Sequence, residues 1–134
     1  MNLGTNDASA FNQPPFTIPE TGETFKQHKN PDGNFMEKDR ERFENAVYDF
    51  LKMIRKNNPE AHIVWVYGML GYDLALPITN AMNRYQKDTG DHNTAFLTLP
   101  NTTTDTVGAH MHPGVKSHER AARVLIEYLQ EIFF

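Results

Sequence analysis

The sequence predicts an α/β protein in which parallel strands lie between layers of helices. Three observations lead to this fold class: apolar runs at residues 63–67 and 94–99, a helical pattern before each run, and a last helical pattern at residues 115–133. Alternation of this kind is typical of a parallel sheet, because the crossover between parallel strands is usually a helix. We therefore expect one domain, spanning residues 1–134, with a partial three-layer α/β/α fold of the flavodoxin type.

The first long helix is expected at about residues 36–57. Asn34 is placed to cap its start, with Glu37 three residues further on as the capping-box partner. Asn57-Asn58-Pro59 ends it, because a residue before proline avoids the helical conformation. Its apolar positions follow a helical period: Phe43, Ala46, Val47, Phe50, Leu51 and Ile54.

Two strands and a second helix follow. The run Ile63–Tyr67 is β-branched and aromatic, as expected of a strand buried on both faces. The second helix is expected after Pro77, with Gly90 beyond its end, and Thr94–Leu99 is the next strand. The inward side chains of this helix are Ile78, Ala81, Met82 and Tyr85.

The two ends of the chain complete the expected sheet. The helix at 115–133 carries the clearest apolar stripe of the chain. Residues 1–4 resemble the end of a further strand, so we expect the N-terminal strands of the sheet to be missing. Residues 8–35 hold four of the eight prolines and are expected to form an irregular loop excursion. The stripe consists of Ala121, Val124, Leu125, Tyr128, Leu129 and Ile132.

Composition excludes several classes of function. The net charge is −4 with no basic cluster, so a nucleic acid is not an expected partner. The absence of cysteine excludes thiol catalysis and Cys-ligated zinc. No apolar run is long enough to span a membrane, and the first residues lack the regions of a signal peptide. No cofactor is expected, and the sequence does not indicate a compartment.

Gly4-Thr5-Asn6-Asp7 is the first candidate for chemistry. It follows a predicted strand end, where ligands bind in open α/β sheets. The amide of Asn6 can donate a hydrogen bond to a developing oxyanion. The alternative is an ordinary turn, because glycine, asparagine and aspartate favour turns for backbone reasons alone.

A histidine cluster before the last helix is the second candidate. His112 can act as a general base near neutral pH. A metal site built from His110, His112 and His118 is a second interpretation, and a purely structural role is a third. Neither Ser9 nor Ser117 lies in a nucleophile elbow, so we do not expect either to be a nucleophile.

These two motifs together resemble the SGNH (GDSL) hydrolases, which are α/β/α esterases. Gly4-Thr5-Asn6-Asp7 matches the family block whose asparagine lies in the oxyanion hole, and the segment around His112-Pro113 matches the block of the catalytic histidine. Residues 58–70, the helix expected after them, Thr94–Pro100 and the pattern HPG-x-x-x-H at residues 112–118 look like the acetyl-xylan-esterase-like members, carbohydrate esterase family two and its relatives. The resemblance implies that Asn6 binds the oxyanion and that His112 is the catalytic base.

The chain departs from the family pattern in two ways. The block with the nucleophilic serine lies upstream of Gly4 in the family, so the chain resembles only the C-terminal portion. Many members also carry an aspartate two or three residues before the histidine, where this chain has His110 and Ala109. In some carbohydrate esterases a backbone carbonyl holds the histidine instead, and Met111 is then expected to supply it. Asp105 is a weaker candidate for the orienting group.

The resemblance implies a serine esterase that deacetylates carbohydrate, impaired here because the nucleophile block is absent. A non-catalytic carbohydrate- or acyl-binding module is the alternative, and a His-ligated metal hydrolase is a third. The expected partners are a small-molecule or polysaccharide ester and a second copy of the chain, which would dimerise through an exposed sheet edge or by swapping elements. The weaker candidates for the substrate pocket are Gly4, Asp7, Tyr67 and Met111.

Overall fold

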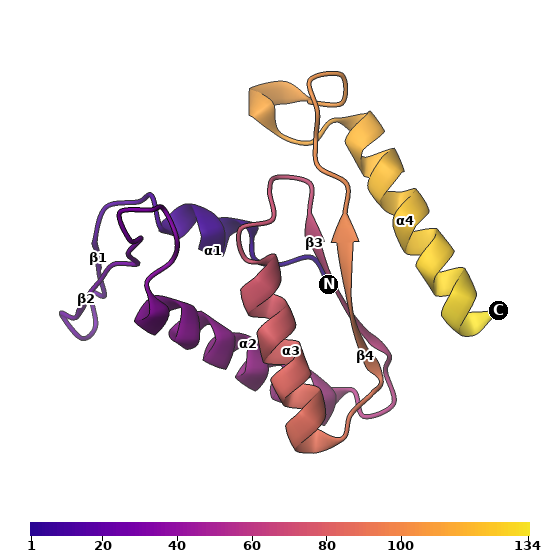
Figure 1. The fold of residues 1–134 in the computed structure, drawn as a ribbon, viewed down its shortest axis with the longest axis horizontal. Coiled ribbons are helices and arrows are strands. Elements are labelled where there is room, and N and C mark those ends of the chain that lie inside the picture. Colours follow the sequence, from indigo (N-terminus) through magenta and orange to yellow (C-terminus); the bar gives the residue numbers. More distant parts are fainter.

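The computed structural model describes all 134 residues and has the predicted α/β architecture (Figure 1). The long elements are α2 (Glu37–Asn57), β3 (Ile63–Gly68), α3 (Ala75–Thr89), β4 (Thr94–Leu99) and α4 (Val115–Phe133). The short elements are α1 (Thr5–Ala10), β1 (Phe16–Thr17), β2 (Thr24–Phe25) and the 3-10 turn η1 (Ala109–Met111). No helix is both long enough and apolar enough to cross a membrane.

The sheet is parallel, as predicted. β3 and β4 pair in parallel along the whole length of both strands. The first residues of the chain lie along the other edge of β3, where Asn2 forms a parallel bridge with Val66. The Val66 amide donates to the Met1 carbonyl over 2.8 Å, and the Met1 amino group donates to the Val64 carbonyl over 2.7 Å. The expectation that residues 1–4 continue the sheet is therefore confirmed.

Helices cover both faces of this sheet, which gives three layers (Figure 1). Trp65 points to the layer of α2 and α3, where it packs edge-on against Phe50. Val66 points to the opposite face and packs in a smaller cluster with Ala121 of α4. β3 is thus buried on both faces, as its unbroken apolar run predicts.

The cap predicted for α2 and the start predicted for α3 were wrong, whereas α2 itself spans Glu37–Asn57 as expected. Met36 rather than Asn34 precedes the first turn of α2, and both the backbone and the side-chain amide of Asn34 donate to Asp32. α3 begins at Ala75, so Pro77 lies within its first turn rather than before it. Proline is tolerated there because the first amides of a helix have no partner inside the helix.

The excursion at 8–35 is more regular than expected. α1 extends into its start, and β1 and β2 form a short antiparallel hairpin within it. The ring of Phe11 lies 4.1 Å from that of Phe35, so the two ends of the excursion pack against each other. Phe11 also belongs to the main core, which anchors the excursion on the domain.

Candidate active site

The candidate site lies at the carboxyl ends of the strands, where the motif at residues 4–7 and the loop after β4 begin. At this end β3 and β4 approach each other closely at Gly68 and Leu99. A methyl group on Gly68, whose φ is 144°, would collide with the carbonyl oxygen of Leu99. Glycine is therefore required at position 68, where the two strands end and their loops begin.

Gly4 turns the chain from the sheet into α1. Its φ of 119° lies in the left-handed region, and an added Cβ would lie 2.9 Å from the ring of Tyr67. Tyr67, which the sequence offered as a weaker pocket candidate, is only 2% exposed and supports this turn from the core. Burial raises the pKa of its hydroxyl. Asn6 and Asp7 are exposed in the first turn of α1, and no protein group bonds the Asn6 amide.

The loop before α4 closes on itself through its backbone. The Gly108 amide donates to the His112 carbonyl over 2.7 Å, and the Gly114 amide donates to the Thr106 carbonyl over 2.9 Å. An added Cβ on Gly114 would lie 2.7 Å from that Thr106 oxygen. The two glycines allow this close backbone contact, which fixes the position of His112 between them.

The ring of His112 is held by a backbone carbonyl. Its Nδ1 lies 3.0 Å from the carbonyl oxygen of His110. The carbonyl can only accept, so Nδ1 carries the proton and Nε2 of the neutral ring is left as the free acceptor. The Met111 carbonyl, which the sequence suggested, was the wrong one. His110 and Met111 adopt φ angles of 53° and 63°, and these left-handed turns bring the carbonyl of His110 back toward the ring.

Asp105 does not orient this histidine. Its carboxylate accepts from the Thr103 hydroxyl over 2.6 Å and pairs with Arg120 over 3.1 Å. The hydrogen bond from Thr103, helped by Arg120, holds the pKa of Asp105 below its ordinary value. Asp105 therefore connects the loop to α4.

Neither serine contacts the His112 ring. Ser117 is 2% exposed, and its hydroxyl lies 3.0 Å from the Thr102 hydroxyl and 3.1 Å from the Thr106 carbonyl. The Ser9 hydroxyl donates to the Asn6 carbonyl over 2.8 Å within α1. Both hydroxyl groups thus have local structural partners.

The three candidate metal ligands are not gathered. His110 lies in η1, His112 follows it, and His118 is exposed on the first turns of α4. No group of three histidine or acidic side chains has an arrangement that could hold a metal ion. The metal interpretation therefore lacks its coordination site.

A shallow groove borders the His112 loop. It lies between the loop after β3 and the loop after β4. Of the residues that line it, the sequence singled out only Met111 as a candidate for the substrate pocket. The lining consists of Met69, Leu70, Gly71, Asn101, Thr102, Thr103, Thr104, Val107 and Met111.

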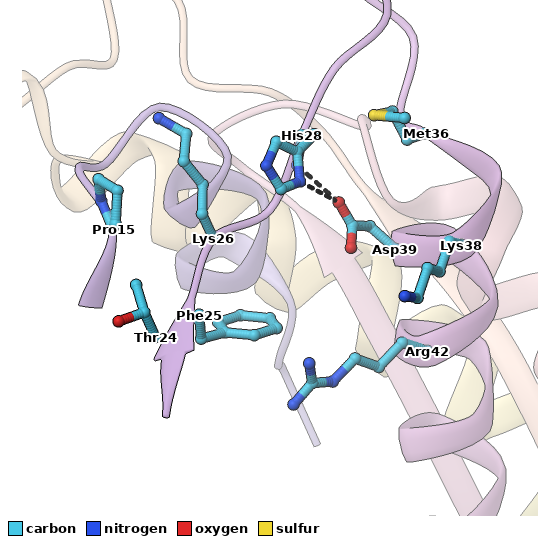
Figure 2. A pocket seen from close by; sticks show the side chains of 9 residues that line it. All are labelled: Pro15, Thr24, Phe25, Lys26, His28, Met36, Lys38, Asp39 and Arg42. Carbon is cyan, nitrogen blue, oxygen red and sulfur yellow. Dashed lines mark hydrogen bonds and ion pairs between the residues drawn. The ribbon is translucent and has the colours of Figure 1, made fainter. Parts of the chain in front are cut away.

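A second cavity lies between β2 and the start of α2 (Figure 2). There Asp39 accepts from the His28 amide over 2.7 Å and lies 3.1 Å from Nδ1 of the same residue. The guanidinium of Arg42 stacks over the Phe25 ring at 4.0 Å. Sequence reasoning missed this imidazole–carboxylate pair, whose double contact ties the excursion to α2.

Comparisons with known proteins agree with this architecture. An acetyl xylan esterase from the rumen bacterium Butyrivibrio proteoclasticus matches 97% of this chain with 49% identity and a TM-score of 0.94. A family two carbohydrate esterase from Clostridium thermocellum, solved with cellohexaose, matches 69% of the chain with 26% identity and a TM-score of 0.62. No family model and no curated protein matches.

The fold and these similarities define the class of protein. The chain is carbohydrate-esterase-like in its α/β architecture. More particularly, it is acetyl-xylan-esterase-like over nearly its whole length. It spans 35% of the first of these esterases and 30% of the second.

Proposed function

We propose that this chain supplies the general base and one oxyanion donor of an SGNH-type serine esterase that removes acetyl groups from carbohydrate. His112 is the base, and Asn6 is the donor. The similarity to an acetyl xylan esterase supports the substrate class. The position of both residues at the carboxyl ends of the strands supports their roles, since ligands bind there in open α/β sheets.

The observation that carries the proposal is the bond between His112 Nδ1 and the His110 carbonyl. This bond fixes the ring in the tautomer whose Nε2 can accept a proton. In a Ser-His-Asp triad a buried carboxylate fixes the tautomer in the same way. The carbonyl dipole also favours the imidazolium that forms when Nε2 takes the proton. A backbone carbonyl thus replaces the missing aspartate.

The reaction then follows ester hydrolysis through a covalent intermediate. Nε2 takes the proton of a serine hydroxyl that lies outside these 134 residues, and the serine oxygen attacks the ester carbonyl. The Asn6 amide stabilises the negative oxygen that forms. The imidazolium gives its proton to the departing sugar oxygen, which leaves as a hydroxyl, and water then releases acetate from the serine in a second, equivalent cycle. The 134 residues alone, without that serine, are impaired as an esterase.

A chimera tests these roles directly. This chain replaces the matching 35% of the Butyrivibrio proteoclasticus esterase, and deacetylation of acetylated xylan is measured. We expect an active chimera in which His112→Ala lowers kcat/KM by about 10³-fold or more, while Asn6→Ala lowers it by about 10²-fold. His118→Ala is the matched control, an exposed histidine that should leave the rate unchanged.

The outcomes separate the competing functions. An unchanged rate in a folded His112→Ala chimera contradicts the proposal. Equal losses in His112→Ala and His118→Ala, together with sensitivity to a chelator, would favour the metal hydrolase instead. The non-catalytic binding module is the remaining alternative. That alternative predicts that the chimera binds acetylated xylan but does not hydrolyse it.

A further inference from the structure

The groove beside the His112 loop has an uncharged lining. None of its nine residues carries a titratable side chain, although the chain as a whole is 22% charged. The cavity in Figure 2, in contrast, is lined by Lys26, His28, Lys38, Asp39 and Arg42. The lining of the groove therefore suits a neutral ligand better than an ionic one.

Hydrogen bonds between its two walls brace the groove. The Gly71 amide donates to Oδ1 of Asn101 over 3.0 Å, and the Thr102 amide donates to the Met69 carbonyl over 2.9 Å. These bonds connect the loop after β3 to the loop after β4 at the same point. The groove is thus fixed by the fold before any ligand arrives, which lowers the entropic cost of binding.

Backbone strain is concentrated at the same place. Met69, His110 and Met111 are the only non-glycine residues with a positive φ. Met69 and Met111 line the groove, and the carbonyl of His110 holds the ring of His112. Residues held in such conformations cluster at functional sites, where the surrounding structure stabilises the strain.

The free groups of the lining match the two kinds of surface on a sugar. Because Oδ1 of Asn101 already accepts from Gly71, its amide nitrogen has donors to spare, and the Thr104 hydroxyl has no protein partner. Leu70 is 48% exposed and Met111 is 77% exposed, so apolar surface lies open beside these groups. A pyranose ring offers hydroxyl groups to these polar side chains and a C–H face to this apolar surface.

The chemistry of the base decides which part of an ester the groove receives. A histidine that deprotonates the nucleophile later protonates the leaving alcohol, so that alcohol must lie within hydrogen-bond reach of Nε2. The groove adjoins the His112 loop through Met111. We infer that the groove is the subsite for the uncharged sugar that leaves as the alcohol; this inference rests on the proposed function.

Methyl NMR of the whole chain tests this subsite with neutral xylohexaose and cellohexaose as probes. The methyl signals of Met69 and Met111 should shift saturably, and that of Met53, exposed on α2, should stay unchanged. Neither probe contains an ester, so the outcome does not depend on catalysis. Binding can therefore succeed where the esterase chimera fails, and the reverse also holds.

An isosteric variant tests the polar half of the subsite. Asn101→Asp retains the Oδ1 acceptor for the Gly71 amide but removes the amide donors and adds a negative charge. We expect the dissociation constant for xylohexaose to rise by at least about fivefold. Asn83→Asp, on an exposed position of α3, is the matched control and should bind as the parent does.

Four results would overturn the assignment. The first is the absence of saturable shifts at Met69 and Met111, and the second is an equal shift at Met53. The third is unchanged affinity in Asn101→Asp while its Gly71 amide signal shows an intact loop. Tighter binding of an oligosaccharide of uronic acids than of the neutral probes would also contradict an uncharged ligand.

Discussion

Replacing Gly114 by alanine should open the loop that holds His112. The φ and ψ of Gly114 are −84° and −179°, which alanine adopts without strain. The effect is therefore purely steric: the new Cβ would lie 2.7 Å from the Thr106 oxygen and 3.1 Å from the Gly108 nitrogen. Ordinary contact needs a displacement of about half an ångström or more, which such tightly packed backbone cannot absorb freely.

The expected loss of stability follows from these contacts. Overpacking a tight site costs about 1 to 3 kcal/mol. The displaced oxygen also accepts from the Gly114 amide over 2.9 Å, and loss of that hydrogen bond adds about 1 kcal/mol. Gly114→Ala should therefore lower the free energy of unfolding by about 2 to 4 kcal/mol, a large fraction of the total for a small domain.

Urea unfolding followed by the fluorescence of Trp65 measures this change, since Trp65 is the only tryptophan and is 3% exposed. Amide NMR signals of residues 106–114 should move at the same time. Gly33→Ala is the control. An alanine at the φ of 84° found there lowers the free energy of unfolding by about 1 to 2 kcal/mol through backbone strain, but its Cβ meets nothing within 4 Å. The reasoning is refuted if Gly114→Ala unfolds within about 0.5 kcal/mol of the parent with unchanged loop signals.

Two further predictions concern acid stability and association. Burial alone would raise the pKa of Asp91, but hydrogen bonds from Arg55 and Tyr85 outweigh it and hold the pKa below its ordinary value. The stability from this lowered pKa is present above about pH 4 and is lost as the pH falls through the pKa of the folded state. The unfolding free energy of Asp91→Asn should therefore fall less steeply in acid than that of the parent. A parallel fall in both proteins would contradict this. Asp91→Asn should also cost about 3 kcal/mol at pH 7, because it removes the counter-charge of the Arg55 guanidinium at a site where both side chains are less than one-fifth exposed. The chain should form a dimer through its exposed sheet edge or by swapping elements; a stable monomer in size-exclusion chromatography with light scattering would rule this out.

The periodicity of the sequence was sufficient for the main architecture. The run at 63–67 predicts a strand buried on both faces, and the structure places α2 and α3 on one face and α4 on the other. The position of Gly4-Thr5-Asn6-Asp7 predicts that residues 1–4 continue the sheet, and their hydrogen bonds to β3 confirm it. Apolar patterning determines these features because burial dominates the stability of strands and long helices.

Other features depend on geometry that residue types do not encode. The choice between the carbonyls of His110 and Met111 depends on two left-handed backbone conformations, which non-glycine residues rarely adopt. The contact between His28 and Asp39 joins residues from the excursion and α2, and only the packing of those segments brings them together. The Asn34 cap failed for a local reason: Asp32 accepts from both the backbone and the side-chain amide of Asn34, which holds this side chain in the turn before the helix.

The tautomer of His112 is the most direct test of the account. Long-range 15N NMR of the chain at a pH where the ring is neutral distinguishes a proton on Nδ1 from one on Nε2. The contact with the His110 carbonyl predicts that Nδ1 carries the proton and Nε2 remains free to accept one. A ring protonated on Nε2, or one that exchanges freely between both forms, would contradict the assignment of this histidine as a base held by the backbone.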